Sequence, residues 1–244
     1  MKTINKFTAF TKLIATHINN IVFINNKLHH VKKYITTYPY HLKKTEILVS
    51  INNDIYIVYN TKTTYLECIF ASELEYIQTS FYLKNPGITS GYAKYFLQRM
   101  HNVKNALILG LCLGNIPNAI YTKHSINRID CVDINSILCK LYKKFFKLST
   151  KIHVYVDSAV TFIENSNKLY DTILVDIPIE FITQSFMNNI YNIITSNGYV
   201  YINLIGSMYN KLNIKKLFNM FNIKYYKVID ENYLYIITKI NNNI

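Results

Sequence analysis

The stretch ALILGLCLGNIPNAIYTKHSINRIDCVDIN, residues 106–135, decides the fold that this sequence encodes. It begins with a short apolar run, stops at Gly110, and continues with a helical pattern after Gly114. A second apolar run follows and ends at Asp133. A strand, a helix and a second strand in this order build a parallel sheet, and glycines between a strand and a helix let the backbone approach a ligand. The stretch therefore predicts an α/β fold with a ligand site after its first strand.

The same alternation continues toward the C-terminus. Further strands are predicted at 152–155, 172–175 and 199–205, and helices over 136–147, 158–164, 186–194 and 208–221. This order implies parallel strands joined by crossover helices. The end of the chain differs, because DEN separates YYKVI from YLYIITKI and predicts a hairpin whose last strand runs antiparallel to the others. A mostly parallel sheet closed by such a hairpin is typical of the Rossmann-like class I methyltransferase fold.

Upstream of residue 103 the apolar pattern changes. The segments EILVSI, IYIVYN and TYLECIF alternate with period two and predict a small antiparallel sheet. The pattern breaks near Pro86, and GYAKYFLQRM then predicts a connecting helix. Before the sheet, apolar residues recur every three to four positions from Phe7 to Val22, as in an amphipathic helix packed on the protein. A targeting peptide is the alternative for this N-terminal helix, although it lacks arginine and an obvious cleavage site.

We therefore expect two domains. Residues 1–102 hold the N-terminal helix, the small sheet and the connecting helix, and residues 103–244 hold the methyltransferase-like Rossmann domain. No run approaches the roughly 20 apolar residues of a membrane span, so no membrane association is expected. The net charge is +13, yet 25 of the 27 basic residues are lysines, whereas arginine is favoured in recognition of phosphates and bases. The composition therefore argues against a nucleic-acid partner.

Cysteine and histidine usage points to no metal centre. The four cysteines are widely spaced with no C-x-x-C pair, which predicts buried thiols in a reducing compartment and a cytoplasmic location. His29, His30 and His41 have no cysteine or carboxylate beside them in the sequence, so we interpret them as solvated side chains.

Acidic residues stand just beyond three successive strands. Asp133 ends the second strand, Asp157 follows the third and Asp176 ends the fourth, although the whole chain has only 14 acids. In a sheet of this kind ligands bind beyond the carboxyl ends of the strands, and a carboxylate after the second strand can accept both hydroxyls of a ribose. For Asp157, an N-capping role on the next helix is the alternative. Three acids at equivalent places favour a common ligand site.

These motifs together resemble the spermidine synthase-like family. GLCLGNIP stands where that family has G-L-G-G-G-x-x-P, CVDIN where it has V-E/D-I-D, VDSA where it has G-D-[GA], and YDTILVD where it has Y/F-D-x-I-x-x-D. YLECIFASELEYIQTSFYLKNPGITSGYAKYF is similar to the strand, glutamine and tyrosine-bearing helix that precede the family's glycine loop. The resemblance covers residues 50–205, and the order and spacing of the motifs carry it.

The resemblance implies a cofactor, S-adenosylmethionine or its decarboxylated form. Gly110 and Gly114 would then shape the loop nearest the cofactor. Asp133 would hold the ribose and Asp157 the adenine, while Gln78 would contact the methionine-derived end.

The resemblance also implies aminopropyl transfer to a small-molecule amine. Asp176 falls on the family's catalytic aspartate, and Tyr92 on a helix tyrosine that positions the aspartate or the amine, with Tyr95 nearly as well placed. An ammonium has no lone pair, so a carboxylate must hold the cation and accept its proton before nitrogen can attack the sulfonium-activated carbon. A homodimer, common among relatives, is left open.

Two places depart from the family pattern. Cys112 and Leu113 replace two glycines of the loop. After the fourth strand the family has D-S-S-D-P and this chain has DIPIE, so Ile179 stands at the second aspartate and Glu180 is the substitute substrate ligand. Two other functions stay open: an S-adenosylmethionine-dependent methyltransferase of unknown acceptor, and a non-catalytic binding or regulatory protein that keeps the fold.

Overall fold

The computed structural model describes residues 21–22, 45–51, 55–60, 65–70, 77–82, 91–205, 213–229 and 232–240. Before residue 83 this description covers the backbone of the strands and one side chain, that of Cys68. The chain divides into two compact units, residues 1–85 and 86–244. The connecting helix therefore belongs to the second unit, and the boundary precedes residue 86 instead of following residue 102.

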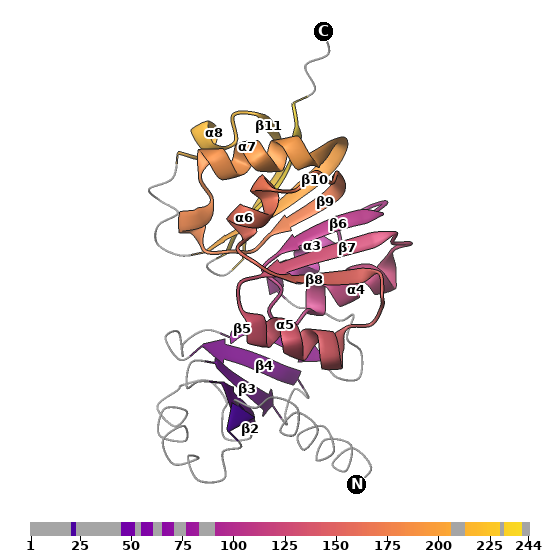
Figure 1. Cartoon of the computed structure of the whole chain (residues 1–244). Helices are drawn as coiled ribbons and strands as arrows, with labels where there is room; N and C mark the ends of the chain where they lie inside the picture. The colour runs from indigo at the N-terminus through magenta and orange to yellow at the C-terminus, as the bar shows by residue number, and fades with distance from the viewer. Residues whose placement is uncertain are drawn as a thin grey trace. The chain divides into compact units, whose positions relative to one another are not determined.

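The first unit contains an antiparallel five-stranded sheet in sequence order (Figure 1). Its strands are β1 (Ile21–Val22), β2 (Thr45–Ile51), β3 (Ile55–Asn60), β4 (Tyr65–Phe70) and β5 (Ile77–Tyr82). The predicted small sheet is thus confirmed. The helix predicted to run to Val22 is wrong at its end, because Ile21 and Val22 pair with Ile51 and Ser50. Strand pairing is non-local and overrides the local period here; the rest of the predicted helix lies outside the described residues.

The second unit alternates strands and helices as predicted. Its elements are α3 (Gly91–Leu97), β6 (Asn105–Leu109), α4 (Asn115–Lys123), β7 (Arg128–Asp133), α5 (Ser136–Leu141), η3 (Tyr142–Phe146), β8 (Ile152–Val156), α6 (Ala159–Glu164), β9 (Tyr170–Val175), η4 (Ile179–Phe181), α7 (Gln184–Ile193), β10 (Ile194–Ile205), α8 (Ile214–Leu217), β11 (Phe221–Ile229) and β12 (Asn232–Lys239). The strand order in the sheet is β11-β12-β10-β9-β6-β7-β8. Strands β6 to β10 pair in parallel, and β12 runs antiparallel to both β10 and β11. This mostly parallel sheet with an antiparallel hairpin is the Rossmann-like class I methyltransferase fold.

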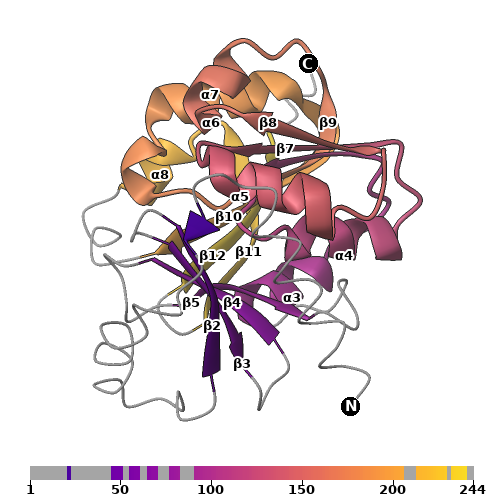
Figure 2. The ribbon, with the colours of Figure 1, turned by 60° about the horizontal axis from the view of Figure 1, so that its bottom comes forward.

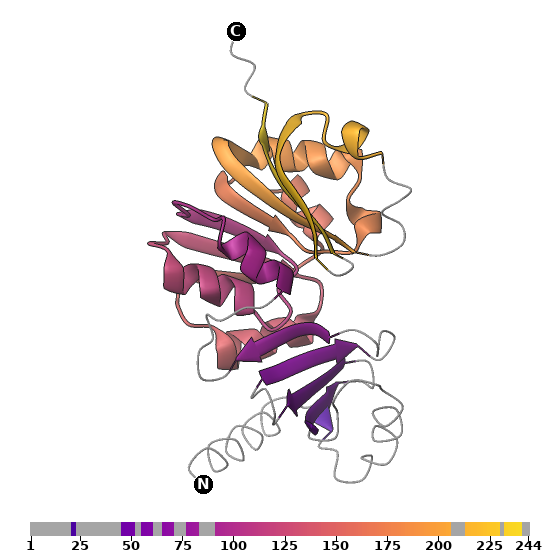
Figure 3. The same cartoon turned by 180° about the vertical axis from the view of Figure 1, so that it is seen from behind.

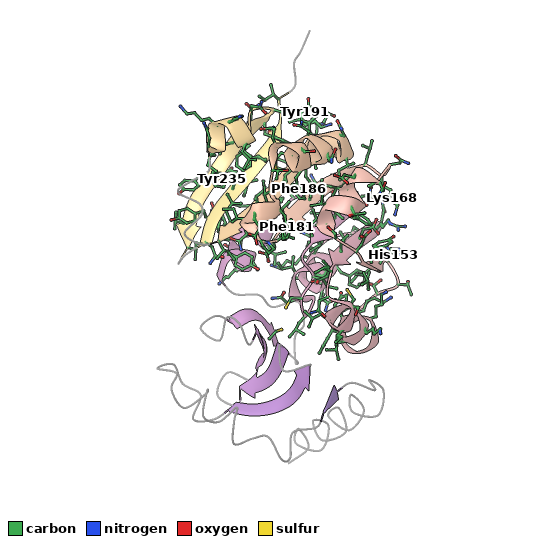
Figure 4. The ribbon with its side chains drawn as sticks, turned by 60° about the vertical axis from the view of Figure 1, so that its left-hand side comes forward. His153, Lys168, Phe181, Phe186, Tyr191 and Tyr235 are labelled. Carbon is green, nitrogen blue, oxygen red and sulfur yellow. The ribbon has the colours of Figure 1, made fainter. Side chains whose placement is uncertain are left out.

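Helices cover both faces of the seven-stranded sheet. Figure 2 shows α6, α7 and α8 on one side and α3, α4 and α5 on the other. Successive side chains of β10 point to opposite faces of the sheet. On one face Tyr201 contacts Phe96 of α3. On the other face Val200 and Ile202 pack in one apolar cluster with Phe186 of α7. Phe186 lies between the helices and the strands in Figure 4, and Tyr235 of β12 extends the same core.

One predicted helix is wrong at its C-terminal end, where the structure has the start of the C-terminal hairpin. We expected a helix over 208–221, but α8 ends at Leu217 and Phe221 begins strand β11, which pairs with β12 (Figure 3). Phe218, in the turn after α8, and Phe221, the first residue of β11, are both buried in the same apolar core. Their spacing in the sequence resembles that of a helix, although they belong to a turn and a strand. Residues 208–212 of the predicted helix lie outside the described part. Among the described helices, none is long and apolar enough to cross a bilayer.

Candidate functional site

The glycine loop and three acidic residues meet at the carboxyl ends of the parallel strands. The backbone amide of Asp176 donates to the carbonyl of Leu109, which joins the end of β9 to the end of β6. The amide of Gly110 donates to Val132, and the amide of Asp157 donates to the carbonyl of Asp133 at 3.2 Å. Adjacent parallel strands end side by side, so residues far apart in sequence converge at one edge.

Glycine is required at two positions of this loop. Gly110 has φ +95°, and a Cβ there would lie 2.1 Å from the backbone oxygen of Asp176. Gly114 has φ +75°, and its Cβ would lie 2.0 Å from Cε2 of Tyr142. Both the left-handed backbone and the close neighbours exclude a side chain at these positions. The loop therefore packs directly on the residue proposed as the base.

The two departures from the family loop are accommodated differently. Cys112 has φ +44°, the left-handed conformation that favours glycine, which costs an ordinary residue about 1–2 kcal/mol. Leu113 is fully buried, so its side chain joins the core of the unit instead of the exposed side of the loop. The loop thus combines a strained cysteine with a buried leucine where the family has glycines.

Asp133 stabilises the loop through backbone hydrogen bonds. Its Oδ2 accepts from the amides of Leu111 at 2.9 Å and Cys112 at 3.0 Å, and its Oδ1 accepts from Asn135 at 2.8 Å. A carboxylate offers about four lone-pair positions, so three are used and one is left on Oδ1. The residue can therefore hold the loop and still accept one hydroxyl of a ribose.

Asp157 is not the N-cap of α6. That position belongs to Ser158, and Oδ1 of Asp157 accepts from the Ser158 amide at 2.7 Å instead of from the first turn of the helix. No hydrogen bond from the described residues occupies its Oδ2. Directly after the neighbouring Asp133, Ile134 is 77% exposed and presents an aliphatic surface. A half-buried acceptor next to an exposed apolar side chain suits a planar, amino-bearing ring.

Asp176 is held by two side-chain donors. The hydroxyl of Tyr92 on α3 donates to Oδ2 at 2.5 Å, and Nδ2 of Asn203 on β10 donates to Oδ1 at 3.0 Å. Burial raises the pKa of Asp176 above its usual value, these two hydrogen bonds partly oppose the rise, and the nearby charge of Asp133 adds to it. Burial and the charge of Asp176 together raise the pKa of Tyr92, so the phenol keeps its proton.

Neither Tyr95 nor Glu180 forms a hydrogen bond with Asp176, whose described side-chain partners are Tyr92 and Asn203. Tyr95, the alternative to Tyr92, is buried under the guanidinium of Arg99, whose Cζ lies 3.7 Å from the ring centroid. Glu180 is exposed on the 3-10 turn η4 and forms no ion pair with the described residues, whereas Ile179 before it is buried in the core. Gln78 lies on β5 in the first unit, and its side chain is outside the described residues.

Sequence analysis missed Asn203. The signal was present, since this asparagine is the polar residue inside YVYINLI, an otherwise apolar strand of the central sheet. A polar side chain that is 1% exposed must have partners, and one partner is the carboxylate of Asp176.

A fully buried carboxylate, that of Asp130, was also missed. It is fully buried on β7 and accepts hydrogen bonds from Nε of Arg128, Nζ of Lys168 and the hydroxyl of Tyr170. Figure 4 shows Lys168 and His153 on the same side of the domain, and the positive charges of this network, after burial, lower the pKa of His153. Each of these donors satisfies the buried charge, so the cluster stabilises the start of β7 and β9.

Comparison with known proteins agrees with this fold. No protein family model matches the chain. A polyamine aminopropyltransferase of Alkaliphilus metalliredigens is 27% identical over 109 residues, which cover 40% of this chain and only 38% of that protein's length.

Solved structures match more of the chain. Spermidine synthase from Thermotoga maritima aligns with a TM-score of 0.56 and 12% identity over 76% of this chain and 68% of that one. Human methyltransferase-like protein 13 in complex with SAH aligns with a TM-score of 0.51 and 18% identity, over 62% and 77% respectively. At these identities the matches establish the class I methyltransferase-like fold.

Proposed function

We propose that this protein transfers a group from an adenosyl sulfonium, S-adenosylmethionine or its decarboxylated form, to a small-molecule amine. The observation that carries the proposal is the carboxylate of Asp176, which accepts a hydrogen bond from Tyr92 and belongs to a residue whose backbone lies directly against Gly110 after β9. The partial sequence similarity to an aminopropyltransferase supports the choice of aminopropyl transfer. That similarity spans well under half of the relative, so the acceptor is part of the proposal.

The polar groups at the strand ends fit an adenosyl ligand. Asp133 has one lone-pair position left for a ribose hydroxyl, and Oδ2 of Asp157 can accept from the amino group of adenine. Ile134 offers the exposed apolar surface on which a planar ring can lie. When bound, the sulfonium supplies an electrophilic carbon whose bond to sulfur breaks on attack, leaving a neutral thioether.

Asp176 then prepares the amine. An incoming ammonium is attracted to the carboxylate, and one of its protons passes to Asp176, which leaves a lone pair on nitrogen for bond formation with carbon. Tyr92 keeps its proton and continues to donate to Oδ2, so it positions the carboxylate without competing for the amine proton. Burial of Asp176 strengthens this attraction because the local dielectric is low.

Calorimetry with S-adenosylmethionine, its decarboxylated form and methylthioadenosine tests the cofactor, and transfer to a panel of amines tests the reaction. Asp176→Asn should keep the affinity for the adenosyl ligand and lower turnover by roughly a hundredfold or more, the scale for loss of a general base. Glu164→Gln removes the same charge from an exposed helix position and serves as the control.

Other outcomes would favour the two alternatives. Methyl transfer that is insensitive to Asp176→Asn would indicate a methyltransferase whose acceptor needs no base. Binding of the adenosyl ligand without turnover on any amine would support a non-catalytic protein that keeps the fold. Failure to bind all three adenosyl compounds would refute the proposal.

A further inference from the structure

Strand β11 forms an open edge of the seven-stranded sheet. It pairs with β12 on one side, and no described strand pairs with it on the other side. A bulge between Ile223 and Tyr225 interrupts the ladder near the start of the strand, whereas residues 225–229 pair with β12 without interruption. In such a run every second residue directs its N–H and C=O groups to the open side. Residues 225–229 are therefore a regular template for one further strand.

The side chains of this edge are largely apolar. Residues 222–228 are all exposed, and four large apolar side chains among them are 45–54% exposed: Ile223, Tyr225, Tyr226 and Val228. The opposite edge strand, β8, has one exposed large apolar residue, Val156. Aromatic and β-branched side chains pack well against those of a neighbouring strand. An exposed apolar edge of this kind indicates an interaction surface.

Two cations lie beside this edge without a carboxylate partner. Both are close to the ring of Tyr95 on α3: Cζ of Arg99 lies 3.7 Å from its centroid, and Nζ of Lys227 on β11 lies 5.3 Å from it. The guanidinium of Arg99 also lies 5.8 Å from the ring centroid of Tyr225. Both ion pairs of the described residues are made by Asp130, so neither neutralises Arg99 or Lys227. Two neighbouring positive charges attract an anionic group to this face.

Charge determines which partner fits the edge. Strand β11 holds Lys224 and Lys227 and no acid, so a second copy would set lysines against lysines across the new ladder. The net charge of +13 on the whole chain also disfavours self-association. A single-stranded nucleic acid would contact the cations and the tyrosines, but it could not pair with the open N–H and C=O groups as a strand does. An extended peptide with carboxylates at every second position satisfies both features.

We propose that β11 is the docking edge for an extended acidic segment of a partner protein. The segment adds as a strand along residues 225–229, and its backbone pairs with the open N–H and C=O groups. Side chains of a strand alternate between two faces, so the acids of the segment lie together and bind Arg99 and Lys227. The apolar side chains of the segment lie on the other face, beside Tyr226 and Val228.

Binding of dye-labelled probes to the full chain, followed by fluorescence anisotropy, tests the inference. The first probe is a blocked peptide of about six residues, the usual strand length, in which glutamate and valine alternate. The matched probes are the same peptide with lysine for glutamate, the same peptide with a central proline, and an oligouridylate of similar charge. We expect the glutamate peptide to bind at least about tenfold more tightly than each of the others. The proline removes a ladder hydrogen bond and separates strand addition from attraction by charge alone.

Hydrogen exchange and two variants locate the binding site. Addition of the glutamate peptide should slow exchange of the amides in residues 225–229. Lys227→Glu reverses one of the two charges and should weaken binding of this peptide about tenfold or more. Lys140→Glu makes the same change at an exposed residue of α5 and should leave the affinity unchanged in about 0.15 M salt, which screens distant charges. Circular dichroism verifies the fold of both variants.

Several results would overturn the inference. Equal binding of the glutamate and proline peptides would show attraction by charge without strand addition. Tighter binding of the oligouridylate would indicate a nucleic-acid partner, and exchange protection of residues 225–229 that rises with protein concentration alone would indicate a second copy. Equal weakening by the two lysine variants, or no binding of the glutamate peptide at about millimolar concentration, would also overturn it.

Discussion

Substitution of Gly110 by alanine should destabilise the second unit strongly. Its φ of +95° costs an alanine about 1–2 kcal/mol. The new Cβ would also lie 2.1 Å from the backbone oxygen of Asp176, which cannot rotate away as a side chain could. The ends of β6 and β9 would have to separate, and overpacking of this kind typically costs about 1–3 kcal/mol. The expected loss in the free energy of unfolding is therefore roughly 2–5 kcal/mol, a large part of the total stability of a domain.

Gly91 provides the matched control. It also has a positive φ, +54°, but an added Cβ would find no atom within 4 Å. Gly91→Ala should therefore show the backbone cost without the steric one. The gain of about 0.4–1 kcal/mol from the lower entropy of the unfolded chain applies to both variants and cancels in their comparison. Urea denaturation followed by far-UV circular dichroism measures both variants, since the chain has no tryptophan for fluorescence. Equal destabilisation by the two substitutions would refute the contact between Gly110 and Asp176 as the reason for this glycine.

Three further predictions concern the carboxylates. Asp133→Ala removes the acceptor of three backbone amides and should weaken adenosyl binding by about 2 kcal/mol, so unchanged affinity in calorimetry with the fold intact would contradict the ribose assignment. Asp130→Ala leaves the hydroxyl of Tyr170 and the charge of Arg128 without this partner, and should lower the free energy of unfolding by about 3 kcal/mol, measured by urea denaturation. A loss below about 1 kcal/mol would show that the cluster is dispensable. Burial raises the pKa of Asp176 in the folded protein, so ionisation of this residue destabilises the folded state as the pH rises above the pKa of the unfolded chain. Asp176→Asn should therefore be more stable than the wild type at pH 8. This gain in stability should disappear below the unfolded pKa, near pH 4. A gain independent of pH would contradict this linkage. Wild-type turnover should rise with pH through the raised pKa of Asp176 in the folded protein.

The sequence by itself determined the fold class and the edge of the sheet at which function is sought. Apolar period, glycine positions and the final hairpin are local signals, and each reflects a backbone preference or a buried face that a few residues decide. Acids after successive strands could also be placed together, because parallel strands end at the same edge. Local signals failed at Ile21 and Phe221, where pairing with distant strands outweighed a helical period.

Only the tertiary structure decided which side chains meet at that edge. Tyr92 and Tyr95 are three positions apart on one helix and look equivalent in sequence, yet one donates to Asp176 and the other packs under Arg99. Asn203 reaches Asp176 because β10 pairs with β9 in one register, in which Ile202 lies beside Val175. A hydrogen bond requires its donor and acceptor atoms to be placed to within a few tenths of an ångström, whereas sequence patterns locate the ends of elements only to within several residues. The partners of the Asp176 carboxylate therefore follow from strand register and helix rotation, which the whole packed core determines.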